Sequence, residues 1–175
     1  SDNLHGLEID PRCAQIAVFN VALAAWKLTG EPIDLPPLHI ACSGLGVDSS
    51  KSEWTKVAGD DDNLKFGMER LYDLFKQAPE LGSLIDPNLT DHPMLDADYS
   101  ELQPLLGKAL GHGITSASDT ERAVSAQGMA KAAELLTSKY TLAITNVPYL
   151  VRQKQNVVLA EFCERITPEA KTDLA

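Results

Sequence analysis

Cysteine, aromatic residues and long apolar runs are all scarce in this chain of 175 residues. The three cysteines, Cys13, Cys42 and Cys163, are an odd number and lie far apart, which argues against a disulfide framework and a cysteine metal site. A reducing, cytoplasmic setting is the simplest interpretation. The longest apolar run, residues 16–26, is interrupted by Asn20 and is too short to span a bilayer, so we expect no membrane partner.

Positive charge is scarce as well, with 15 basic residues against 25 acidic ones and a formal net charge of −10 at pH 7. A surface that binds a nucleic-acid duplex is normally basic, so the composition alone does not indicate a DNA clamp. An acidic domain can still act on DNA when another part of the protein holds the phosphates.

Clusters of metal-ligating residues are also missing from the sequence. The four histidines are scattered, and the acidic run at residues 60–62 has no returning ligand elsewhere in the chain. Such a run is typical of a solvated loop at the start of a helix. We therefore predict no metal site.

The hydrophobic pattern of the first 45 residues predicts a strand, a helix and a second strand. Residues 4–9 and 38–42 have the apolar content of short strands, and residues 11–28 form a helix between them. Asp10 is a favoured N-cap, and Gly30 supplies the left-handed residue that ends many helices. A right-handed parallel βαβ unit is expected. The helix is apolar almost all round, which predicts burial on more than one side.

Glu8 lies at the carboxyl end of the first predicted strand. In dinucleotide-binding folds an acidic residue at the end of a strand binds ribose hydroxyls, because a carboxylate can accept from two vicinal hydroxyls at once. The alternative is a solvated carboxylate at a strand end.

Residues 46–139 predict a helical insertion. Apolar residues recur at helical spacing over residues 64–78, which Asp62 or Asn63 can cap, and again over residues 102–110. Pro79 opens a short helix, and the pattern at residues 118–121 resembles a capping box that opens a helix through about Ser138. The insertion has two interpretations: a lobe that lines a nucleic-acid cleft, or packing over one face of the sheet.

The last part, residues 140–175, predicts a short buried strand at residues 142–144 that stops at Asn146-Val147-Pro148-Tyr149. Pro148 has no N–H and cannot continue a central ladder. By itself this tetrapeptide is a strand-ending turn. A helix that ends before Pro168 follows. Arg152 and Lys154 lie between this turn and the helix. They are either phosphate contacts or solvated loop charges.

A resemblance is carried by Gly6-Leu7-Glu8-Ile9-Asp10-Pro11, the helix and strand that follow, and Thr145-Asn146-Val147-Pro148-Tyr149. These segments resemble amino-methyltransferases that use S-adenosylmethionine, and more narrowly the adenine-N6 DNA methyltransferases of the large restriction and phage-exclusion (BREX) type. The stretch at residues 78–85 also resembles a segment of that group. The resemblance implies an α/β fold, namely a partial Rossmann-like core with a large helical insertion. Its parts would be residues 1–45, 46–139 and 140–175 of one domain, which we expect to be truncated at both ends.

The resemblance also implies roles for individual residues. The side-chain oxygen of Asn146 and the backbone carbonyl of Val147 would accept hydrogen bonds from the adenine amine, with Pro148 completing the turn. Tyr149 would stack on the flipped base. The implied partner is double-stranded DNA with a flipped adenine, together with other subunits of a defence system.

On the cofactor side, the resemblance assigns the ribose of S-adenosylmethionine to Glu8 and its adenine ring to Ile9. Cys42 or Ser43 would make the polar contact to that ring, where the family commonly has Asp.

Two departures from the family pattern keep other interpretations open. The family's Gly-rich loop would precede Ser1 and is absent, and Val147 replaces the first of two prolines. We therefore expect the isolated chain to bind S-adenosylmethionine poorly and to be inactive. The alternatives are a methyltransferase for RNA bases or a protein glutamine, and a degenerate, non-catalytic domain for recognition or assembly. A nicotinamide-binding fold that uses Glu8 would leave Asn146–Tyr149 unexplained.

Overall fold

The computed structural model describes residues 3–44, 50–87, 104–107, 116–145, 152–166 and 168–169. The chain divides into two compact units, Ser1–Thr137 and Ser138–Ala175. The first unit contains the predicted residues 1–45 together with nearly all of the helical insertion. The second unit contains the predicted catalytic part.

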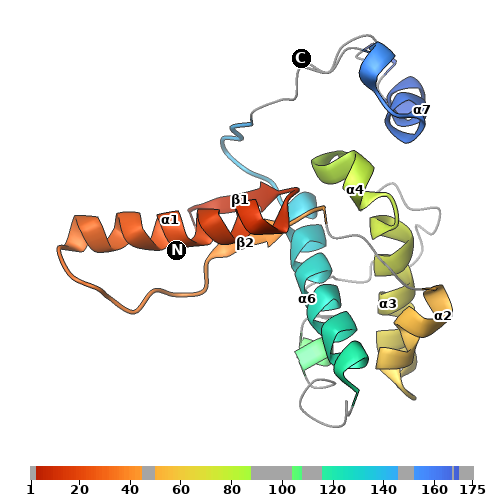
Figure 1. Cartoon of the computed structure of the whole chain (residues 1–175), viewed down its shortest axis with the longest axis horizontal. Coiled ribbons are helices and arrows are strands. Elements are labelled where there is room, and N and C mark those ends of the chain that lie inside the picture. The colour runs from red at the N-terminus through yellow and green to blue at the C-terminus, as the bar shows by residue number, and fades with distance from the viewer. Residues whose placement is uncertain are drawn as a thin grey trace. The chain divides into compact units, whose positions relative to one another are not determined.

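Strand β1 (His5–Glu8), helix α1 (Pro11–Thr29) and strand β2 (His39–Cys42) form the predicted βαβ unit. The two strands are parallel, with His5 opposite His39 and Glu8 opposite Cys42. Figure 1 shows α1 running alongside both strands, which it contacts. Within the described part of the chain the sheet has only these two strands. The complete Rossmann-like core therefore stays a prediction.

Both ends of α1 have the caps that the sequence predicts. The side chain of Asp10 accepts a hydrogen bond from the backbone N–H of Arg12 at 2.8 Å. Gly30 has φ +81° and its N–H donates to the carbonyl of Trp26. The indole N–H of Trp26 donates to the carbonyl of Ile33 at 2.9 Å, which ties the proline-rich connection to the end of the helix.

The predicted burial of α1 on more than one side is wrong for the structure described. Ala14 is the one buried residue of this helix, whereas Ile16 is 58% and Phe19 is 60% exposed. The reason is that α1 packs mainly on β1 and β2, which cover one face of the helix. A helix pattern that is apolar all round indicates what the chain can bury, but the neighbouring elements decide how much of it is buried.

The insertion is helical, as predicted, and it begins with α2 (Lys51–Trp54) and the 3₁₀-helix η1 (Thr55–Ala58). Helix α3 (Asp62–Phe75), helix α4 (Ala78–Leu81) and the 3₁₀-helix η2 (Gly82–Leu84) follow. Residues 104–107 are helical. The long helix α6 (Ala117–Thr137) closes the unit.

The core of the first unit lies mainly between α3 and α6, which contact one another (Figure 1). Trp54 is 2% exposed, and its indole N–H donates to the carbonyl of Met68 at 2.8 Å, which fastens α2 to α3. Helix α6 also contacts β2, and the ammonium of Lys131 donates to the carbonyl of Leu38 at 2.7 Å. The fully buried side chains are contributed by several elements and include Met68, Leu71, Phe75, Leu106, Ala126, Met129 and Ala133.

The helix caps of the insertion differ from those predicted. Asp61, rather than Asp62 or Asn63, caps α3 by accepting from the N–H of Leu64. A capping box that was not predicted is present at Ser50 and Glu53.

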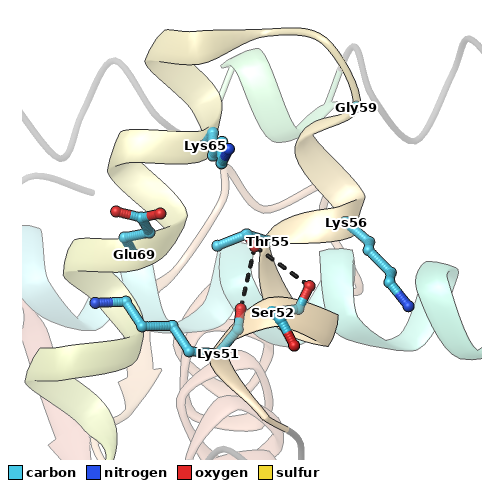
Figure 2. Close-up of a pocket in the computed structure, with 7 residues that line it drawn as sticks. All are labelled: Lys51, Ser52, Thr55, Lys56, Gly59, Lys65 and Glu69. Atoms are coloured by element: carbon cyan, nitrogen blue, oxygen red, sulfur yellow. Dashed lines mark hydrogen bonds between the residues drawn. The ribbon is translucent and has the colours of Figure 1, made fainter.

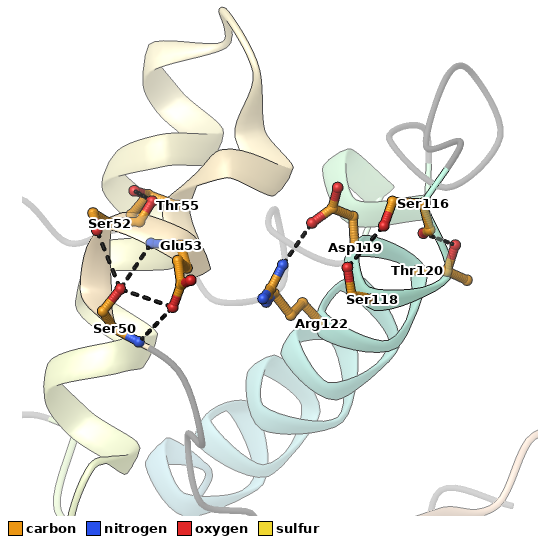
Figure 3. A network of polar contacts seen from close by, with 9 residues as sticks. All are labelled: Ser50, Ser52, Glu53, Thr55, Ser116, Ser118, Asp119, Thr120 and Arg122. Atoms are coloured by element: carbon orange, nitrogen blue, oxygen red, sulfur yellow. Dashed lines mark hydrogen bonds and ion pairs between the residues drawn. The ribbon is translucent and has the colours of Figure 1, made fainter.

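The capping box predicted at residues 118–121 is not observed. Helix α6 begins at Ala117, whereas a capping box with Ser118 as the N-cap would begin it at Asp119, so Ser118 lies inside the first turn. There Ser118 shares a hydrogen bond with Ser116, and Asp119 forms an ion pair with Arg122 (Figure 3).

The second unit contains the 3₁₀-helix η3 (Arg152–Lys154) and helix α7 (Val157–Ile166). Helix α7 ends before Pro168, as predicted, and Asn156 accepts from the N–H of Leu159 at its start. The buried strand predicted at residues 142–144 is not observed. This segment is irregular, with Leu142 74% and Ile144 89% exposed. A strand needs a neighbour to satisfy its backbone groups, and the described residues provide none here.

The N-cap of α1 leads to a testable prediction about the pKa of Asp10. The Arg12 side chain, and then the Arg12 backbone N–H, hold the pKa of Asp10 below its usual value of 3.8. The carboxylate thus supports the helix start at pH above 3.8, and this support is lost as pH falls through the lowered pKa. Replacing Arg12 by alanine is expected to raise the pKa of Asp10 toward 3.8, as measured by NMR titration. An Arg165→Ala variant should leave the pKa of Asp10 unchanged. Equal shifts in both variants would show that Arg12 is not the cause of the lowered pKa.

Candidate functional site

The carboxyl ends of β1 and β2 bring together three residues that the sequence analysis assigned to a cofactor. Glu8 is the last residue of β1 and lies opposite Cys42 in register. Ser43 follows Cys42, and its N–H donates to the carbonyl of Glu8 at 2.8 Å. Ile9 follows Glu8. The parallel register therefore places Glu8, Ile9 and Ser43 at one edge of the sheet, where open α/β folds bind ligands.

The carboxylate of Glu8 is held by the backbone that follows it. Its Oε1 accepts from the N–H of Ile9 at 2.9 Å and from the N–H of Asp10 at 3.2 Å. These two hydrogen bonds fix the direction of the side chain without using both oxygens. Oε2 is the oxygen that could accept from vicinal hydroxyls of a ligand.

Ile9 is confined by two glycines from distant parts of the sequence. A Cβ placed on Gly44 would overlap the Ile9 carbonyl, lying 2.8 Å from its carbon. A Cβ on Gly82 would lie 2.9 Å from Cδ1 of Ile9, and Gly82 also has φ +53°. Because neither position admits a side chain without movement, the glycines let two chain segments approach Ile9 closely. Ile9 remains 45% exposed and presents an apolar surface.

Gly82 also belongs to the candidate site, although the sequence did not indicate a role for it. It belongs to the stretch at residues 78–85, which carried part of the resemblance but received no function. Gly82 is the C-cap of α4 and the first residue of η2, which contacts β1, and this position places it beside Ile9. A glycine inside that stretch was the signal available in the sequence.

Cys42 and Ser43 differ in what they can offer a ligand. The thiol of Cys42 donates to the carbonyl of Ile9 at 3.3 Å, so it fastens the two strand ends together. Ser43 is 1% exposed and presents almost no surface. Its predicted contact with a cofactor ring stays a prediction.

The amine half of the predicted site is described only in part. Asn146, Val147, Pro148 and Tyr149 lie outside the described residues, and their roles stay predictions. Arg152 forms an ion pair with Glu164 inside the second unit. This pair reduces the charge that Arg152 offers to a phosphate.

Lys154, the other predicted phosphate contact, is exposed in η3. In the described ranges no group of three or more histidine, cysteine or acidic side chains has the geometry of a metal site. Over the same ranges no helix has the length and apolar content needed to cross a membrane.

Comparison with known proteins gives one informative match. The chain is 28% identical, over 178 aligned residues, to a protein of Lacticaseibacillus casei (strain Zhang) named adenine-specific methyltransferase PglX. The match covers 98% of this chain and 14% of the relative, so the chain spans about one seventh of that protein's length. No family model matches the chain. No solved structure matches it. The chain is thus distantly similar, over almost its whole length, to part of an adenine-specific methyltransferase.

Proposed function

We propose that this chain is part of a methyltransferase that transfers a methyl group from S-adenosylmethionine to the N6 amine of a flipped adenine in DNA. The observation that carries the proposal is the carboxylate of Glu8, held by its own turn at the carboxyl edge of a parallel βαβ unit. The distant similarity to an adenine-specific methyltransferase supports the same chemistry. The proposed fold is a Rossmann-like core of which β1, α1 and β2 form one part.

The residues at the strand ends fit one half of such a cofactor. Oε2 of Glu8 would accept hydrogen bonds from the two ribose hydroxyls, and the fixed direction of the carboxylate lowers the ordering cost of binding. Ile9 would pack on the adenine ring, because its exposed surface is apolar and is held between two glycines. When bound, the cofactor supplies an electrophilic methyl group.

The amine half of the chemistry would belong to the tetrapeptide at residues 146–149. The lone pair of the adenine amine is delocalised into the ring, so the amine is a poor nucleophile. Acceptors on its hydrogens, the side-chain oxygen of Asn146 and the carbonyl of Val147, would localise that lone pair. Tyr149 would stack on the base after it leaves the duplex. The nitrogen–carbon bond would form as the bond between sulfur and the methyl group breaks, and the surplus proton would leave the amine for solvent.

Catalysis of this kind needs no covalent enzyme intermediate. Most of the acceleration would come from positioning and from preorganised hydrogen bonds. The biological setting that we propose is a restriction-modification or phage-defence system. There the intact protein would act on double-stranded DNA and assemble with other subunits.

A transfer assay on the intact protein tests the proposal. Tritium-labelled S-adenosylmethionine is incubated with adenine-containing DNA, with the matching RNA, and with DNA already methylated at adenine N6. We expect label in the unmethylated DNA and little in the other two substrates. Label in RNA would assign a different acceptor, and no transfer to any substrate would contradict the activity.

A second candidate function is a degenerate domain for recognition or assembly. The observation that favours it is Val147, which replaces a proline and leaves its own φ less restricted. Pro148 still biases residue 147 toward extended geometry, and the carbonyl acceptor is kept. DNA binding by the intact protein without any methyl transfer would favour this alternative.

Replacing Glu8 by glutamine tests the cofactor half by itself. Glutamine can keep one oxygen for the N–H groups of Ile9 and Asp10, but its NH₂ group replaces the second acceptor. We expect S-adenosylmethionine to bind the intact protein about tenfold more weakly, as measured by calorimetry. Glu53→Gln is the matched control, because Glu53 also caps backbone but lies in α2. Equal affinities for wild type and Glu8→Gln would remove Glu8 from the site.

A further inference from the structure

A pocket of about 590 Å³ lies between α2, η1 and the first half of α3 (Figure 2). Lys51, Lys56 and Lys65 line it together with Ser52, Thr55 and Glu69. Three of the chain's 15 basic residues therefore gather at one concave surface of a protein whose net charge is −10. We call this surface the lysine pocket.

The lysine pocket is built on well-fastened elements. Trp54, at the end of α2, is 2% exposed and donates to the carbonyl of Met68 in α3. The chain reverses between η1 and α3 at Gly59, whose φ is +56°. Thr55 Oγ1 donates to the carbonyls of Lys51 and Ser52, which closes the turn from α2 to η1. The lysines therefore extend from a scaffold whose backbone is held in place.

The charges that face the pocket leave it positive. The ammonium of Lys51 donates to Oδ2 of Asp73 at 2.6 Å, and Glu69 is the one acidic residue of the lining. Among the described residues no carboxylate lies within ion-pair distance of Lys56 or Lys65. Glu53 lies outside the lining, and its pKa is lowered first by hydrogen bonds from Ser50 and less by the charges of Arg122 and Lys56.

The chemistry of the lining selects phosphate over a base. Lysine ammoniums are compact charges that bind phosphate without fixed direction. The lining contains no aromatic ring on which a base could stack and no side-chain amide that could read a base edge. Its volume exceeds that of one phosphate group, so a stretch of sugar–phosphate backbone suits it better than a free ion.

We propose that the lysine pocket holds the phosphate backbone of the nucleic acid and positions the duplex without reading its sequence. The proposal rests on the proposed function, since it assumes a nucleic-acid substrate. It gives the helical insertion a role in binding. It also supplies positive charge in a chain whose overall composition is unfavourable for DNA.

The test is the salt dependence of DNA binding by the intact protein. Each neutralised phosphate contributes about 0.9 to the slope of log K against log salt for duplex DNA. Lys56→Ala combined with Lys65→Ala is expected to lower the slope by about 2 and to weaken binding equally for unrelated sequences. Fluorescence anisotropy over a series of salt concentrations measures both. If the double variant fails to fold, the single glutamine variants should each lower the slope by about 1.

Lys27→Ala combined with Lys76→Ala is the matched control. It removes the same charge from the exposed end of α1 and from the C-cap of α3, neither of which lines the pocket. An unchanged slope in the pocket variant, or an equal change in both variants, would overturn the proposal. So would saturable binding of inorganic phosphate that the pocket variant loses while its DNA slope stays unchanged.

The two proposals fail separately. A lysine-dependent slope in a protein that transfers no methyl group would refute the proposed function and keep the pocket. Methyl transfer together with DNA binding whose slope and affinity do not depend on these lysines would refute the role of the pocket and keep the proposed function.

Discussion

Replacing Asn146 by alanine in the intact protein is expected to lower the rate of methyl transfer to DNA by about 10²- to 10³-fold, the loss typical of one preorganised hydrogen-bonding group. The side-chain oxygen of Asn146 is the proposed acceptor for one hydrogen of the adenine amine. Alanine leaves that hydrogen unpaired, so the lone pair stays delocalised in the ring. The affinity for S-adenosylmethionine should stay unchanged, because Asn146 is proposed to contact the base alone.

Two further variants separate chemistry from folding at this turn. Asn146→Asp keeps an acceptor oxygen and should retain part of the activity. Val147→Pro introduces the proline that is usual in the methyltransferase family the sequence resembles and should keep or raise turnover, since it fixes φ before Pro148. Single-turnover measurements with labelled cofactor give the rates. Full activity of Asn146→Ala, or a large loss in Val147→Pro, would contradict the proposed roles.

Replacing Gly44 by alanine is expected to destabilise the first unit by about 1–3 kcal/mol and to weaken cofactor binding more than tenfold. The added Cβ would overlap the backbone carbonyl of Ile9, which cannot move aside as a flexible side chain would. Relief requires the ends of β1 and β2 to separate. That movement breaks the hydrogen bond from Ser43 to Glu8 and displaces the carboxylate.

Gly107→Ala is the matched control for this prediction. A Cβ at Gly107 would meet only the side-chain nitrogen of Gln127, at an ordinary contact distance of 3.7 Å. Chemical unfolding followed by circular dichroism gives the stability, and calorimetry with the intact protein gives the cofactor affinity. If both glycine variants behave like the wild type, Ile9 and Gly44 do not define the strand ends as described.

Much of the local structure that neighbouring residues decide was predictable. Asp10 and Gly30 could be predicted as the caps of α1, because a cap depends only on the residues next to it. The parallel pairing of the strands followed from the order strand–helix–strand. The same reasoning located α7 and its end before Pro168. The capping box at residues 118–121 was predicted wrongly, because several serines and threonines compete for the start of one helix.

The candidate site also combines features that the sequence predicts with features that only the tertiary structure shows. The position of Glu8 and Ile9 at the end of the first strand could be predicted from sequence, whereas their roles toward a cofactor stay predictions. The approach of Gly82 to Ile9 could not be predicted, because more than 70 positions separate them in the chain. The lysine pocket could not be predicted from the sequence either. Lys51 and Lys56 line one pocket with Lys65 only when α2 packs on α3.

By itself, the sequence determined the βαβ unit, its caps, the helical character of the insertion and the resemblance carried by Glu8 and Asn146–Tyr149. The caps and helices depend on contacts between residues close in the chain, and the parallel pairing of the two strands follows from the order of the elements. Only the tertiary structure decided which apolar residues are buried, which glycines surround Ile9 and where the lysines gather. These depend on packing between distant segments. For this reason α1, apolar almost all round, has Ile16 and Phe19 exposed.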